Sequence, residues 1–240
     1  IGVDTIDLDA ATAAGIIVTN NPTYCVEEVA DHSMAMVLTC ARKIAFYDRQ
    51  VRAGQWAVPP GKPMFRLAAC TMGLVGYGNI ARQVAVRAAA FGMRVIYSDP
   101  FVKEGQFDTP GKKVELNDLL KESDFISVHM VLAAATRGVV GAADLARMKP
   151  TAYIVNTSRG PLIDEQALLK ALQDKKIGGA GLDVFWTEPL PADHPLRKLD
   201  NVVLTPHVGY VVDDNMKMFY VNALANIKRW MAGEPLTQLK

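Results

Sequence analysis

Short apolar runs rich in β-branched residues alternate with amphipathic stretches along most of this chain of 240 residues. Such alternation is typical of an α/β fold, in which a parallel sheet carries helices on both faces and the crossovers are right-handed. We therefore expect a doubly wound parallel sheet with the strand order 3-2-1-4-5-6. The expected strands are Met72–Val75, Arg94–Ser98, Phe125–His129, Ala152–Asn156, Ala180–Val184 and Val202–Thr205.

A glycine-rich turn, G-Y-G-N-I-A, follows the first expected strand and opens an amphipathic segment. Gly76 and Gly78 allow a tight turn and let the backbone approach a pyrophosphate, which the amides and dipole of a helix start would hold. Asp99 ends the next strand about 20 residues on, where a carboxylate accepts hydrogen bonds from the adenosine ribose. An ordinary strand-to-helix turn can also contain glycines, but here the strand, helix and acid stand in the order of a Rossmann dinucleotide site. A carboxylate at Asp99 repels a 2′-phosphate, so NAD is favoured over NADP.

Composition narrows the class of protein and its partners. Half of the residues are hydrophobic, and a net charge of +1 without a basic cluster argues against direct binding of nucleic acid. No apolar run approaches the roughly 18 residues of a membrane span, so we expect a cytoplasmic protein that does not bind membranes. No residues have zinc-ligand spacing, and no metal site is expected. We interpret the cysteines as core thiols in a reducing compartment; they are Cys25, Cys40 and Cys70.

Two long helices are predicted to bracket the sheet. Apolar residues recur at helical spacing from Val26 to Ala41 and again from Met216 to Met231. Their placement suggests connections to a second, smaller domain built from both ends of the chain. We expect residues 1–20 to end the first part of that domain, residues 21–209 to form the nucleotide-binding domain with its linker helix, and residues 210–240 to return to the second domain. Because the chain opens in mid-pattern without Met, the upstream part of that domain is expected to be missing from this sequence.

Three ionisable residues follow three successive expected strands: Arg159, Glu188 and His207. Ligands of an open parallel sheet bind beyond the carboxyl ends of its strands, so these side chains are expected to converge beside the cofactor. The guanidinium can pair with a substrate carboxylate and polarise a 2-oxo group. Histidine can exchange a proton with the carbonyl oxygen as hydride reaches carbon, and a carboxylate on the far imidazole nitrogen orients the ring. Each residue alone is commonplace, but together they indicate oxidoreduction of a 2-hydroxy acid.

Several motifs resemble the D-isomer-specific 2-hydroxyacid dehydrogenases over essentially the whole chain. The matching segments are Val75–Ala81, Val155–Glu165, Gly181–Phe185, Glu188–Leu190 and Leu204–Gly209. The resemblance implies an NAD-dependent enzyme with a flavodoxin-like substrate domain, acting on a small 2-oxo or D-2-hydroxy acid as a homodimer. It implies that Arg159 binds substrate, that His207 is the acid/base and that Glu188 assists it. The residues it places at NAD are Gly76, Gly78, Asn79, Ile80, Asp99, Thr157, Asp183 and Gly209.

Other interpretations stay open at this point. The family also includes corepressors, so an NAD(H)-sensing interaction protein with little or no turnover is the main alternative. A methyltransferase could use the glycine turn, but it would leave Arg159, Glu188 and His207 unexplained. His129 could reach the pyrophosphate or could equally be a strand-end core residue. After it, Val131 and Ala133 stand where the family usually has Pro and Thr.

Overall fold

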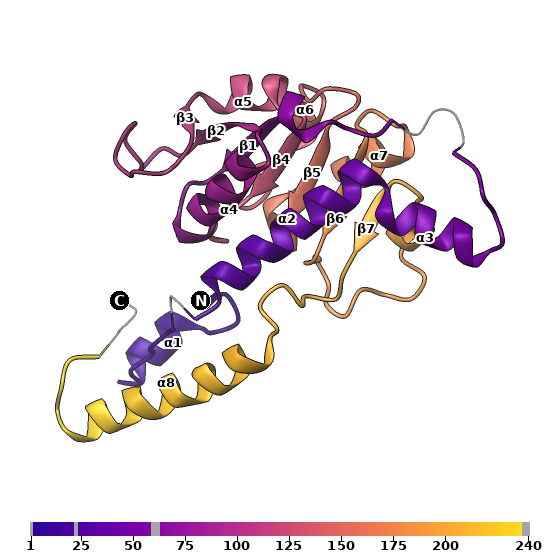
Figure 1. Cartoon of the computed structure of the whole chain (residues 1–240). Helices are drawn as coiled ribbons and strands as arrows, with labels where there is room; N and C mark the ends of the chain where they lie inside the picture. Colours follow the sequence, from indigo (N-terminus) through magenta and orange to yellow (C-terminus); the bar gives the residue numbers. More distant parts are fainter. Residues whose placement is uncertain (1, 22–23, 59–62, 237–240) are drawn as a thin grey trace.

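A single parallel sheet forms the centre of the molecule (Figure 1). The structure is a computed structural model that describes residues 2–21, 24–58 and 63–236. The sheet has seven strands in the order β3-β2-β1-β4-β5-β6-β7, and every neighbouring pair is parallel. The strands are β1 Thr71–Val75, β2 Arg94–Ser98, β3 Lys112–Lys113, β4 Phe125–Val128, β5 Tyr153–Asn156, β6 Gly179–Leu182 and β7 Val202–Leu204. The predicted α/β class with a doubly wound Rossmann sheet is confirmed.

The expected strand order needs one correction. Counted over the strands predicted from sequence, the order 3-2-1-4-5-6 would put Phe125–His129 beside β2, whereas β4 pairs with β1 through Met72↔Phe125 and Val75↔Val128. The place beside β2 is taken by β3, which the sequence analysis did not predict. With two lysines and no apolar run, β3 has no pattern by which a strand is recognised.

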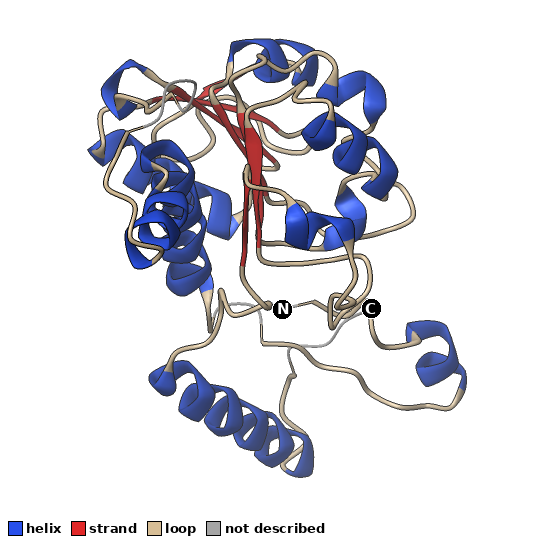
Figure 2. Cartoon of the chain, turned by 90° about the vertical axis from the view of Figure 1, so that its right-hand side faces the viewer, coloured by secondary structure: helices blue, strands red, loops and turns tan. Residues whose placement is uncertain are grey.

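Helices cover both faces of the sheet (Figure 2). Helices α2 and α4 pack together on one face, and α5, α6 and α7 cover the other. These helices are α2 Val26–Arg42, α4 Asn79–Ala90, α5 Leu116–Glu122, α6 Ala142–Leu145 and α7 Glu165–Gln173. Successive strand residues point to opposite faces, and since both faces are covered, the strands read as continuous apolar runs rather than alternating ones.

Each face of the sheet has its own hydrophobic core. Leu74 and Val155 point into the core under α2 and α4, while Val75 and Ile154 point into the core under α5 to α7. The three cysteines are buried with free thiols, which confirms their interpretation as core residues. Short 3-10 turns complete the layers at η1 Leu67–Ala69, η2 Gly160–Leu162 and η3 Pro195–Lys198.

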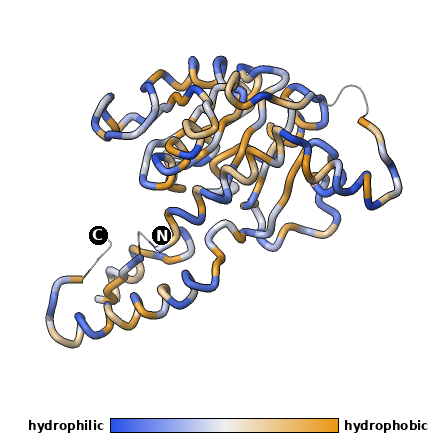
Figure 3. Tube along the Cα trace, in the orientation of Figure 1, coloured by the Kyte–Doolittle hydropathy of each residue, from blue (hydrophilic) through white to orange (hydrophobic). Residues whose placement is uncertain are grey.

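Three helices lie away from the sheet. Helix α3, Ile44–Arg52, continues from the end of α2 and points outward (Figure 1), while α1, Leu8–Ala13, and α8, Asp213–Met231, lie beyond the end of the sheet and apart from each other (Figure 2). The prediction that two long helices bracket the sheet is therefore right for α2 and wrong for α8. Apolar residues alternate with polar ones along α8, and most of its apolar side chains are exposed (Figure 3). Among the described residues, no helix has both the length and the apolar character needed to cross a membrane.

Candidate active site

The glycine turn lies between the carboxyl end of β1 and the start of α4. Gly76 has φ +87°, and a Cβ there would lie 2.8 Å from the carbonyl oxygen of His129, so only glycine fits. At Gly78, which precedes α4, an added Cβ would meet nothing within 4 Å. The fold itself therefore leaves open space over this glycine. The first amides of α4, from Asn79 and Ile80 onward, have no carbonyl one turn earlier in the helix, and such a cradle suits a pyrophosphate.

Asp99 follows β2 and is fixed beside the glycine turn. Its Oδ2 accepts a hydrogen bond from the Tyr77 amide at 2.8 Å, and its Oδ1 accepts one from the Phe101 amide at 2.8 Å. A carboxylate oxygen can accept more than one hydrogen bond, so both retain capacity for ribose hydroxyls. The Tyr77 ring stacks on Tyr97 beneath the turn, with ring centroids 3.8 Å apart. The fixed acid and open glycine together fit an adenosine diphosphate moiety.

His207 and Glu188 form the expected pair beyond the ends of β6 and β7. The Nδ1 atom of His207 lies 2.6 Å from Oε2 of Glu188, and both side chains are about one-third exposed. Glu188 is held in turn, because its Oε1 accepts from the Phe185 amide at 2.8 Å. The Tyr210 ring stands edge-on to the imidazole at 5.9 Å between centroids. The ring of His207 is thus oriented from two sides.

Arg159 follows β5 and reaches the N-terminal segment of the chain. Its Nε donates to both carboxylate oxygens of Asp4, at 3.0 and 3.1 Å, and its Nη1 donates to the Ser158 carbonyl at 2.7 Å. Partial burial raises the pKa of the Asp4 carboxyl, but the hydrogen bond and charge of Arg159, with a smaller effect of His207, outweigh it and leave that pKa below its usual value. Asp4 therefore lies within electrostatic reach of both Arg159 and His207.

Asp183 is buried and surrounded by donors. Its Oδ1 accepts from the Thr205 hydroxyl at 2.5 Å and the Val208 amide at 3.0 Å, and its Oδ2 accepts from the Gly209 amide at 2.9 Å. Desolvation raises its pKa, yet hydrogen bonds from His32, Thr205 and the two amides outweigh burial and keep the pKa below its usual value. The Gly209 amide is thus committed to Asp183.

Thr157 lies at the end of β5 with its hydroxyl 2.8 Å from that of Ser33 on α2. Ser33 itself donates to the Val29 carbonyl at 2.7 Å, one turn earlier in α2. The predicted cofactor residue is therefore tied to the helix that covers this face of the sheet. Thr157 lies beside the carboxyl edge of the sheet, and its contact with NAD stays a prediction.

The comparisons with known proteins now decide the family. A family model described as the NAD-binding domain of D-isomer-specific 2-hydroxyacid dehydrogenases matches residues 34–209. The chain belongs to the D-isomer-specific 2-hydroxyacid dehydrogenases. The site described above lies almost wholly within the matched residues, and the protein is an NAD-dependent oxidoreductase of that family.

Relatives of this dehydrogenase are named for several different substrates. The chain is 43% identical to a glyoxylate reductase of Korarchaeum cryptofilum, over 98% of this chain and 72% of the relative. It is 41% identical to a D-3-phosphoglycerate dehydrogenase of Methanocaldococcus jannaschii, over 98% of this chain but only 45% of that relative. A solved glyoxylate reductase from Paecilomyes thermophila superposes with a TM-score of 0.90 at 35% identity, covering 99% of this chain and 72% of that one.

His129 of the dehydrogenase faces its own strand end. Its Nε2 lies 2.8 Å from the Ser127 hydroxyl, while its Nδ1 is buried, and no hydrogen-bond partner for it is found among the described residues. Desolvation lowers the pKa of His129 to about 4. This geometry agrees with a neutral strand-end histidine.

Sequence reasoning missed three polar contributors to the dehydrogenase site. Asp4 is 155 positions from Arg159, and neither spacing nor motif relates the two. His32 of α2 lies 3.0 Å from Thr205 and 3.3 Å from Asp183, both more than 150 residues further along the chain. Ser33 stands within the apolar stripe of α2, and a polar residue there is a signal that could have been used. Within the described parts of the chain, no group of three or more His, Cys, Asp and Glu side chains is arranged to hold a metal ion.

Proposed function

We propose that this protein reduces a small 2-oxo acid to the D-2-hydroxy acid, and catalyses the reverse reaction, with Arg159, Glu188 and His207 as the catalytic residues. The observation that carries the proposal is the pair formed by Nδ1 of His207 and Oε2 of Glu188, 2.6 Å apart, beyond the carboxyl edge of the NAD-binding sheet. Relatives named glyoxylate reductase and hydroxypyruvate reductase support the substrate class. When bound, NADH supplies the hydride.

The pair with Glu188 assigns one role to each nitrogen of His207. Nδ1 donates its hydrogen to the carboxylate, so Nε2 is the nitrogen left to exchange a proton with substrate. In the protonated ring, Nε2–H donates to the 2-oxo oxygen and transfers its proton as the carbon is reduced. The neutral ring keeps Nδ1–H on Glu188 and regains a proton at Nε2 from solvent. The reverse reaction uses Nε2 as the base.

Arg159 retains N–H donors for a substrate, with the Gly2 backbone packed close to its Nη2, where an added Cβ would lie 1.7 Å away. Asp4 occupies Nε, and the Ser158 carbonyl takes one proton of Nη1. Of the five N–H donors, those remaining belong to Nη1 and Nη2, which together form the fork that pairs with a carboxylate. We propose that this fork binds the substrate carboxylate and the 2-oxo oxygen. The ion pair with Asp4 fixes the direction in which the fork points.

At the other end of the cofactor, we propose that Gly76, Gly78, Asn79 and Ile80 hold the pyrophosphate and that Asp99 binds the ribose. The open space over Gly78 and the fixed carboxylate of Asp99 support these roles. We further propose that Thr157, Asp183 and Gly209 line the nicotinamide end. Their support is their position at the ends of β5 and β6 and in the turn after β7.

We also propose that residues 1–20 and 210–240 belong to the second domain of this enzyme, with residues 21–209 forming the nucleotide-binding domain. Every residue of α1 is at least partly exposed, and α8 presents many exposed apolar side chains. Asn226 of α8 donates to Thr19 at 3.5 Å, which links the two chain ends. Exposed apolar side chains gathered on one helix mark a surface that packs on other structure.

The enzyme is proposed to act as a homodimer through its nucleotide-binding domains. Helix α3 and the residues after it carry apolar side chains outward from the sheet, with Val51 52% and Trp56 90% exposed. Large exposed aromatic residues are typical of interfaces. A cytoplasmic location is proposed as well, because free buried thiols suit a reducing compartment.

The test is NADH consumption by the purified protein with glyoxylate, hydroxypyruvate, pyruvate and bulkier 2-oxo acids, alongside NADH affinity by fluorescence. Two forms are assayed: the 240-residue protein and, where the gene encodes upstream residues, the form that includes them. Turnover with any of these acids supports the proposal. Tight NADH binding with no turnover in either form would contradict it and favour an NAD(H)-sensing interaction protein.

A further inference from the structure

The backbone that carries His207 is shaped by Asp183. Besides the hydrogen bonds to the Asp183 carboxylate, the carbonyl oxygen of the same residue accepts from the His207 amide at 2.8 Å. The Thr205 amide is bound next to it, donating to the Leu182 carbonyl at 3.0 Å. Residues 205–209 therefore form a turn built around the end of β6. The direction of the His207 side chain depends on this turn.

That turn holds an unfavourable backbone conformation. His207 has φ +56°, in the left-handed region that residues other than glycine seldom adopt. A conformation of this kind persists only where surrounding contacts impose it. At Gly209 the packing is close: an added Cβ would lie 3.0 Å from Oδ2 of Asp183 and 3.2 Å from Cδ2 of His32. The imidazole of His32 is thus packed directly against the turn.

His32 comes from α2, outside the strand ends that form the turn. Its Nε2 lies 3.0 Å from the Thr205 hydroxyl oxygen and 3.3 Å from Oδ1 of Asp183. The Thr205 hydroxyl donates its one hydrogen to Asp183, so its oxygen is an acceptor toward His32. Nε2 faces two acceptors and must carry a hydrogen. The contact fixes the tautomer of His32 and binds α2 to both Thr205 and Asp183.

We propose that His32 is a positioning residue, whose Nε2–H donates to Thr205 and Asp183 and thereby holds the turn that directs His207 toward Glu188 and the substrate. The proposal rests on the acid/base role of His207 proposed above. It assigns a function to a helix residue that lies 175 positions before His207 in the chain. His32 itself need not touch the reacting atoms.

Two variants of His32 separate hydrogen bonding from packing. His32→Gln retains an N–H donor at similar reach, whereas His32→Leu keeps a bulky side chain without a donor. The matched control is His194→Leu, because His194 forms the other imidazole–carboxylate pair outside the site, with Nε2 3.0 Å from Glu165. Displacing a catalytic group by about 1 Å can cost roughly 100-fold in rate.

We therefore expect His32→Leu to lower kcat about 10- to 100-fold with little change in KM for the 2-oxo acid, since Arg159 is outside this network. His32→Gln should recover most of the rate, and His194→Leu should match wild type. Equal loss in Leu and Gln variants would show a packing role and overturn the proposal. Unchanged kcat in His32→Leu would also overturn it.

A second measurement does not depend on turnover. Long-range ¹H–¹⁵N NMR reports the tautomer and surroundings of each ring, and the sequence contains only four histidines. The His207 ring signals should move in His32→Leu and return toward wild type in His32→Gln. If the wild-type protein turns over no 2-oxo acid, the proposed function fails while this readout still decides the positioning role. If His207 signals stay unchanged in an active enzyme, only the positioning role fails.

Thr205→Val and Thr205→Ser provide the same comparison if His32→Leu does not fold. Val removes the hydroxyl that lies between His32 and Asp183, and Ser retains it. The expected pattern is a displaced His207 signal and lower kcat in Thr205→Val, with both near wild type in Thr205→Ser. Equal behaviour of Val and Ser variants would contradict the proposal.

Discussion

The two ends of the sheet use charged residues differently. At the carboxyl end, Asp99 and His207 are held by neighbouring groups but keep further hydrogen-bonding capacity. At the amino end, the Lys43 side chain is buried where α2 ends, and its ammonium donates to the Cys40 carbonyl at 2.9 Å and to the Tyr153 hydroxyl. Its Nζ also lies 4.0 Å from the centre of the Tyr153 ring. The comparison distinguishes groups that can still bind a ligand from groups whose hydrogen bonds are already used within the fold.

The largest expected effect tests the carboxyl end. His207→Ala should lower kcat by about 10²- to 10⁴-fold, the usual contribution of a general acid or base, while NADH affinity stays near wild type. Steady-state assays and NADH fluorescence measure the two quantities. His194→Ala is the control, since its imidazole also pairs with a glutamate. Normal turnover in His207→Ala would remove it from the reaction.

His129 lies at the carboxyl end of the sheet but has the surroundings of a structural residue, so it tests whether the two ends really differ. Its pKa is lowered by burial to about 4, below the unfolded value of 6.5. The unfolded chain then binds a proton that the folded chain does not, so this stabilisation is complete above about pH 6.5 and is lost as pH falls toward 4. At about 1.4 kcal/mol per pKa unit, the loss reaches at most roughly 3.5 kcal/mol.

His129→Gln cannot titrate and should therefore show a flatter pH dependence of the free energy of unfolding between pH 6.5 and 4. Urea unfolding at several pH values in this range measures it, with His194→Gln as the control. Parallel curves for His129→Gln and wild type would mean that His129 is protonated alike in the folded and unfolded chains. Acid-linked stability would then have to come from carboxylates such as Asp183.

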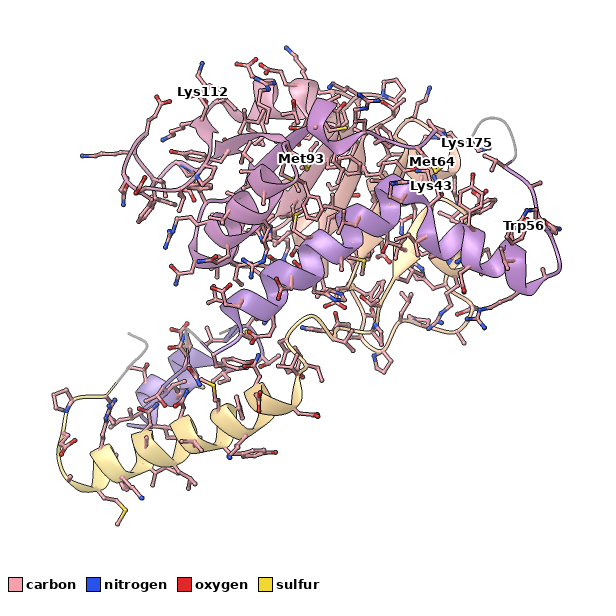
Figure 4. The ribbon with its side chains drawn as sticks, in the orientation of Figure 1. Lys43, Trp56, Met64, Met93, Lys112 and Lys175 are labelled. Atoms are coloured by element: carbon pink, nitrogen blue, oxygen red, sulfur yellow. The ribbon has the colours of Figure 1, made fainter. Side chains whose placement is uncertain are left out.

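Substitutions at the amino end of the sheet should change the free energy of unfolding rather than cofactor binding. Lys43→Met keeps the aliphatic stem and removes the charge-assisted hydrogen bonds, which should lower the free energy of unfolding by about 1–3 kcal/mol. NADH affinity should not change. The control is Lys112→Met, because Lys112 is exposed on β3 at the far edge of the sheet (Figure 4). A loss of NADH binding in Lys43→Met without a loss of stability would break the comparison between the two ends.

The smallest expected effect concerns cofactor choice. Asp99→Asn retains an oxygen for the amide of Tyr77 or Phe101 but removes the negative charge. The ratio of NADPH to NADH dissociation constants should fall by about tenfold, since a 2′-phosphate is no longer repelled. Asp108→Asn, an exposed acid in the same loop, is the control. An unchanged ratio would make Asp99 a loop-fixing residue only.

Sequence patterns recovered the sheet because its strands are buried on both faces. Arg94–Ser98 was predicted with the observed bounds, and the other predicted strands agree within two residues at either end. The short β3 was missed, because pairing with β2 rather than hydrophobicity makes it a strand. The apolar stripe of α8 correctly predicted a helix but not its neighbours, since periodicity shows that a face is apolar and not what covers it.

The candidate site divides in the same way. The sequence predicted which residue types gather at the edge, because parallel strands bring their carboxyl ends together there. The pair of His207 with Glu188 was expected for this reason. The sequence did not predict two contacts: Asp4 with Arg159, and His32 with Asp183. Both join segments more than 150 residues apart, and no local pattern encodes which side chains meet across such a separation.

The sequence by itself determined the parallel sheet, the glycine turn at Gly76 and the residue types at the carboxyl edge of the sheet, because hydrophobic period, backbone sterics and strand direction are local properties. The tertiary structure alone decided which hydrogen bonds those residues form. It placed five donors around Asp183 and its carbonyl, imposed φ +56° on His207 and left Gly78 open. These features arise only when α2, β6 and the turn after β7 are packed together, since each supplies groups that the others lack.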